Sequence, residues 1–69
     1  MNAAVIEARD LIFKFFEKEP WKALVWWQAP NPLLGGISPV DMLKIGREEK
    51  LLKFIKGQLA ENEPPEPRP

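Results

Sequence analysis

A chain of 69 residues has room for one domain, and without cysteine or histidine it has neither disulfides nor the usual zinc ligands to stabilise it. Their absence also removes the most common general base and the most readily activated nucleophile, so we expect no enzyme activity, no cofactor and no metal. Ten basic residues balance ten acidic ones, so on charge grounds we do not expect a nucleic-acid partner. Neither a membrane span nor a secretory signal is visible, so we expect a cytoplasmic protein.

The first predicted helix covers residues 2–19. Its main apolar arc, at helical spacing, consists of Val5, Ala8, Leu11, Ile12, Phe15 and Phe16. Ile6 and Phe13 lie outside this arc, and because they are seven residues apart they lie on the same side of the helix. They are either partly exposed edges of a wide core stripe or a second apolar patch that meets a partner, and both interpretations stay open.

A second predicted helix covers residues 20–28, where Pro20 suits the first helical position. The segment is apolar nearly all round, which is typical of a helix buried on several sides. Trp26 and Trp27 are adjacent and therefore point about 100° apart on a helix. We expect one of them to face the core and the other to face a neighbour or partner.

A loop rich in proline and glycine follows at residues 30–38. Pro30 and Pro32 stiffen its start, while Gly35 and Gly36 can adopt positive φ and permit a sharp reversal. Between these pairs stand Leu33 and Leu34, and because large apolar residues are unusual in a loop, we expect at least one of them to fill a pocket of the core.

The end of this loop predicts a helix start. Ser38 is a favoured N-cap, Pro39 fits the first helical position, and Asp41 stands at the third. Ser38 carries the only aliphatic hydroxyl of the chain, and this pattern makes it a cap rather than a nucleophile. The predicted third helix covers residues 39–45, and Gly46 suits a left-handed C-terminal cap.

The last predicted helix covers residues 47–60, and its apolar face consists of Leu51, Leu52, Ile55 and Leu59. Lys50, Lys53 and Lys56 spread over the other side. They are interpreted as a solvated face, with phosphate or acidic-protein binding as the weaker alternative.

Residues 61–69 form a proline-rich acidic tail without an apolar anchor, which predicts an extended or disordered segment. The sequence therefore predicts an all-α fold: a small compact bundle of about four helices within residues 1–60. Three tryptophans and four phenylalanines exceed what so small an interior readily holds, so we expect some apolar surface to meet another chain.

The segment from Trp26 to Leu43 resembles the toxin-binding domain of Xre/MbcA/ParS-like antitoxins. The motif residues that carry the resemblance, beyond Trp26 itself, are Pro30, Asn31, Pro32, Leu34, Gly35, Gly36, Ser38, Pro39 and Gly46. The likeness extends over roughly residues 10–60. Trp27 stands where that family usually has leucine, and no helix-turn-helix region precedes the domain here, so a stand-alone module is expected.

The resemblance implies a non-catalytic module that binds and neutralises a cognate toxin, commonly an NAD-consuming enzyme of the RES type, and that tends to self-associate. The residues expected to contact the partner are Trp26, Trp27, Leu33, Leu34, Ile6 and Phe13. The alternative is a structural module whose surplus apolar surface closes a homo-oligomer without inhibiting any toxin.

Overall fold

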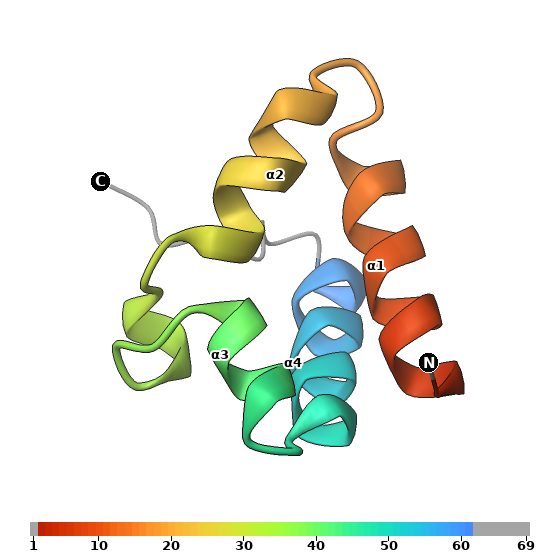
Figure 1. The fold of residues 1–69 in the computed structure, drawn as a ribbon. Helices are drawn as coiled ribbons and strands as arrows, with labels where there is room; N and C mark the ends of the chain where they lie inside the picture. The colour runs from red at the N-terminus through yellow and green to blue at the C-terminus, as the bar shows by residue number, and fades with distance from the viewer. Residues whose placement is uncertain (1, 62–69) are drawn as a thin grey trace.

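The computed structural model describes residues 2–61, and Figure 1 shows their path as a bundle of helices. The elements are α1 (Ala3–Phe15), α2 (Pro20–Gln28), the 3-10 turn η1 (Pro32–Leu34), α3 (Pro39–Lys44) and α4 (Glu48–Ala60). The predicted all-α fold with four helices is confirmed. Of the tail predicted to be disordered, only Glu61 lies within the described residues.

The first helix is shorter than predicted. It ends at Phe15 instead of continuing to Glu19, and the chain then turns through a hydrogen bond of 2.8 Å from the Glu19 N–H to the Phe16 carbonyl. Pro20 then disfavours helical geometry in the residue before it. Glu19 accordingly adopts φ −141° and ψ 68°, and α2 begins at Pro20 as predicted.

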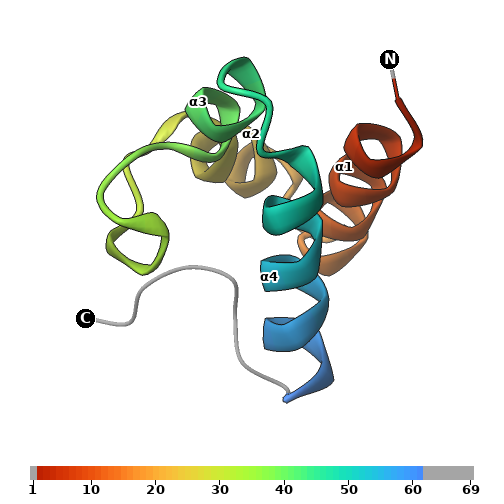
Figure 2. The same cartoon turned by 90° about the horizontal axis from the view of Figure 1, so that it is seen from below.

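Helices α1 and α4 lie side by side and run in the same direction (Figures 1 and 2). Two polar contacts join their outer edges: the Asn2 amide donates to a Glu48 carboxylate oxygen at 2.9 Å, and the Lys56 ammonium lies 2.8 Å from a Glu7 carboxylate oxygen. Figure 2 shows α1 on one side of α4 and α3 on the other. Helix α2 packs against both α1 and α3.

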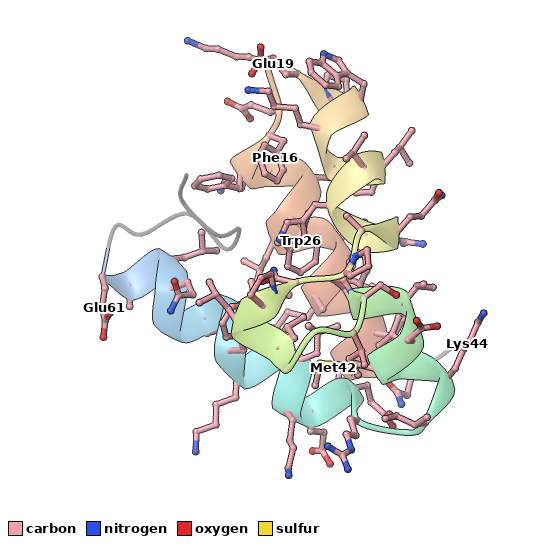
Figure 3. All side chains as sticks on the ribbon, turned by 90° about the vertical axis from the view of Figure 1, so that its left-hand side faces the viewer. Phe16, Glu19, Trp26, Met42, Lys44 and Glu61 are labelled. Atoms are coloured by element: carbon pink, nitrogen blue, oxygen red, sulfur yellow. The ribbon has the colours of Figure 1, made fainter. Side chains whose placement is uncertain are left out.

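All four helices, and Phe16 just after α1, contribute buried side chains to the core. These are Ala8, Ile12, Phe16, Ala23, Trp26, Trp27, Met42, Leu51 and Ile55. In Figure 3 the labelled Trp26 and Met42 point into the bundle, whereas Lys44 points away from it. Phe15 departs from the predicted core arc, because it lies at the last position of α1 and is exposed.

The expectation that Trp26 and Trp27 would divide between core and surface is wrong. Their side chains are only 4% and 9% exposed, and their rings meet edge to face at 5.1 Å between centroids. Their directions do differ, but α2 has neighbours on two sides, α1 and α3, so each indole finds its own packing surface.

The loop that connects α2 with α3 is held by its own hydrogen bonds. Buried Asn31 accepts the Leu33 N–H on its side-chain oxygen at 2.9 Å, and its backbone pairs with Ile37 in an isolated bridge. Gly35 and Gly36 turn the chain between them with φ of 81° and 88°. As predicted, Ser38 caps α3 by accepting the Asp41 N–H at 3.2 Å.

Helix α3 ends as predicted at a left-handed glycine. Gly46 has φ 76°, its N–H donates to the Leu43 carbonyl at 3.1 Å, and the next N–H, of Arg47, reaches back to Met42 at 2.9 Å. This pair of bonds is the Schellman arrangement. It turns the chain sharply, so that α4 starts almost at once and covers the inner side of α3.

Candidate protein-binding surface

An apolar groove of about 240 Å³ opens between α1, α2 and α3. Its apolar walls are formed by Val5, Phe13, Leu24, Trp27, Val40 and Leu43. A concave apolar surface of this kind accepts an apolar side chain of another molecule.

Two polar residues border the groove, Arg9 from α1 and Gln28 from α2. The Arg9 guanidinium lies 3.8 Å from the Asp10 carboxylate, and both side chains are about half exposed or more. An exposed contact at this distance contributes little stability, so Arg9 can turn toward an incoming ligand at small cost. Gln28 offers both a donor and an acceptor at the other border.

Trp27 combines a buried ring with an unsatisfied polar atom. Its indole N–H is buried and has no hydrogen-bond partner among the described residues. Burying such a donor without an acceptor costs about 1–3 kcal/mol. The ring therefore stabilises the fold through apolar burial, while its buried N–H carries a penalty.

The outer face of α2 is a second apolar surface, which the sequence analysis did not single out. Trp21, Leu24 and Val25 are 59%, 55% and 58% exposed. They recur at the spacing that places residues on one side of a helix, and Leu24 also lines the groove. We call these three residues the outer stripe. The expectation that α2 would be buried on several sides holds only for its inner half.

The predicted contact residues do not gather in one place. Phe13 is half-buried and lines the groove, while Ile6 is exposed on α1 and does not line it. On η1, Leu33 is half exposed, whereas Leu34 packs against the core and so fills the pocket expected of this pair. Trp26 is interior, and Trp27 is buried but lines the groove.

Other surface features point to no specific ligand. A hollow of about 400 Å³ lies beside the turn between α1 and α2. It is lined by positively charged lysines and negatively charged glutamates, in addition to Phe15 and Phe16. Lys50, Lys53 and Lys56 are exposed, and the ion pair of Lys56 with Glu7 reduces the positive charge of that face.

Within residues 2–61, no group of three or more acidic side chains is placed to hold a metal ion. None of the helices described is long and apolar enough to cross a membrane.

Comparisons with known proteins gave no match: no family model, no curated protein and no solved structure corresponds to this chain.

Proposed function

We propose that this chain is a non-catalytic protein-binding domain of the antitoxin type, which binds a cognate toxin of the NAD-consuming RES class and blocks its activity. The observation that carries the proposal is the apolar groove between α1, α2 and α3. The domain holds a concave apolar surface open beside a stiffened loop, and that loop carries the residues that resemble the antitoxin motif.

The motif residues have a physical role that fits this proposal. Asn31, Gly35, Gly36 and Ser38 make the bonds and turns that set the start of α3, and α3 supplies Val40 and Leu43 to the groove. The motif thus shapes one wall of the surface instead of touching the partner throughout. Phe13 and Trp27 form the aromatic part of the opposite walls, and aromatic side chains are frequent anchors at interfaces.

The groove is tested with Val40→Glu. Val40 occupies the second position of α3, where a carboxylate suits the positive end of the helix dipole, so the helix should tolerate the change while the groove acquires a charge. Ile45→Glu is the matched control, because Ile45 is 59% exposed and does not line the groove.

The measurement has two steps. The tagged chain is used to isolate its partner from native cells, and the isolated enzyme is then assayed for NAD consumption with each variant added. We expect stoichiometric inhibition by the native chain and by Ile45→Glu, and at least about thirtyfold weaker binding by Val40→Glu, as expected where a contact worth 2 kcal/mol is lost. A partner that does not consume NAD, or equal binding by both variants, would overturn the proposal.

A further inference from the structure

We propose that the partner segment which enters the groove between α1, α2 and α3 carries an acidic side chain next to its apolar anchor, and that Arg9 binds this carboxylate. The inference rests on the proposed use of the groove as a protein-binding surface, and it names the chemistry of what enters. Among the described residues that line the groove, Arg9 alone carries a charge, and the others except Gln28 are apolar. An apolar group beside a carboxylate is therefore the chemistry that complements this surface.

The size of the groove favours a side chain of another protein over a free small molecule. Its volume of about 240 Å³ lies below the roughly 300–1,000 Å³ of pockets that enclose drug-sized ligands. A single large apolar side chain can occupy such a space while the rest of its segment stays outside. The residue next to that anchor then passes the border of the groove, where Arg9 and Gln28 lie.

Arg9 lies in the middle of the wall that α1 contributes. Val5, Arg9 and Phe13 follow one another at intervals of four residues, so they share one side of the helix. The aliphatic part of the arginine side chain can pack beside its apolar neighbours while the guanidinium stays in water. A purely structural role would use only the aliphatic part, so a test of the inference has to isolate the charge.

The Arg9 guanidinium has only a weak partner in the folded chain. Its Nε lies 3.8 Å from the Asp10 carboxylate, whereas charge-assisted bonds between such groups are usually about 2.7–2.9 Å long. Within residues 2–61, no other acidic residue pairs with Arg9. A carboxylate that arrives at the border can accept two parallel N–H bonds from the guanidinium, and it displaces only this loose contact.

Two blocked dipeptides test the carboxylate directly. Phenylalanyl-glutamate and phenylalanyl-glutamine, both acetylated and amidated, have nearly the same shape and differ by one charge. Each is titrated into the isotope-labelled chain and followed by NMR, where the Trp27 indole N–H and the Gln28 side-chain amide report from residues that line the groove. We expect both dipeptides to shift these signals, and the glutamate form to bind about threefold more tightly, as an ion pair at a partly exposed site contributes.

Arg9→Met keeps an aliphatic side chain but removes the charge, so it should equalise the two affinities without preventing binding. Lys50→Met is the matched control, because it also removes one positive charge, from an exposed residue of α4 that does not line the groove. Arg9→Lys restores the charge without the fork of N–H donors, so it should restore only part of the preference.

Three outcomes would overturn the inference. They are an absence of shifts at Trp27 and Gln28 with either dipeptide, equal binding of the two dipeptides by the native chain, and a preference for glutamate that survives Arg9→Met. With the isolated toxin, we expect Arg9→Met to weaken binding by at least about tenfold, as the loss of a hydrogen-bonded charge pair does, and Lys50→Met to leave it unchanged.

The inference and the proposed function fail separately, because the dipeptides need no toxin. A captured partner that does not consume NAD would remove the proposed function and leave the preference for glutamate intact. Conversely, toxin inhibition that is lost in Val40→Glu, by a chain that binds the two dipeptides equally, would retain the function and remove the inference.

Discussion

Trp26 and Trp21 stand on the same short helix, yet the first is almost fully buried and the second is more than half exposed. Their intrinsic hydrophobicity is identical, so the difference comes from what lies opposite each ring. Trp26 faces the interior formed by the other helices, whereas no described element covers Trp21. The inner face of α2 thus contributes to stability, and the outer face remains available for association.

The largest expected effect is that of Trp26→Ala. Removing a buried tryptophan side chain costs about 3–5 kcal/mol, and a domain of this size has a total unfolding free energy of only about 3–10 kcal/mol. We expect urea unfolding, followed by circular dichroism, to show a variant that has lost most of its stability. Trp21→Ala is the control on the outer face, with an expected change within about 0.5 kcal/mol. Equal losses from the two variants would contradict the division of α2 into two faces.

A smaller effect is expected when volume is added to each face. Ala23 is fully buried, so Ala23→Leu overfills the interior and should cost about 1–3 kcal/mol. Val25→Leu adds a methylene group on the exposed side and should stay within about 0.5 kcal/mol of the native chain. Thermal unfolding midpoints of the two variants measure the contrast. If Ala23→Leu were tolerated as well as Val25→Leu, the packing around α2 would be looser than described.

The smallest effect concerns the loop that positions α3. Ser38→Ala removes the side-chain cap on the Asp41 N–H and should cost about 1 kcal/mol in chemical denaturation. Ser38→Gly should cost only a few tenths of that amount, because glycine is itself a tolerated cap. A loss from Ser38→Gly as large as that from Ser38→Ala would mean that the buried hydroxyl matters through packing and not through the cap.

Much of the fold follows from local sequence signals. Ser38, Pro39 and Gly46 place the two ends of α3, because capping depends on residues within one turn of the helix end. Pro20 places the start of α2 in the same way. The predicted end of α1 was too late by one turn, because the helical spacing of apolar residues does not reveal the hydrogen-bonded turn that follows Phe15.

The candidate surface was less predictable. Phe13 and Leu33 were expected at a contact surface and are at least partly exposed, but Trp26 is interior, and Trp21, Leu24 and Val25 were not singled out. In a helix that is apolar nearly all round, polar and apolar residues do not alternate at helical spacing. The sequence therefore contains no signal that separates the covered side of α2 from its open side.

The sequence by itself determined that the chain is all-α and where most of its helices begin and end, because these properties depend on neighbouring residues in the chain. Only the tertiary structure decided that both Trp26 and Trp27 are buried, that a groove remains beside the short α3, and that the outer stripe of α2 has no covering element. Burial depends on which distant helices meet, and α1 and α3 approach α2 from two sides while leaving its third side open.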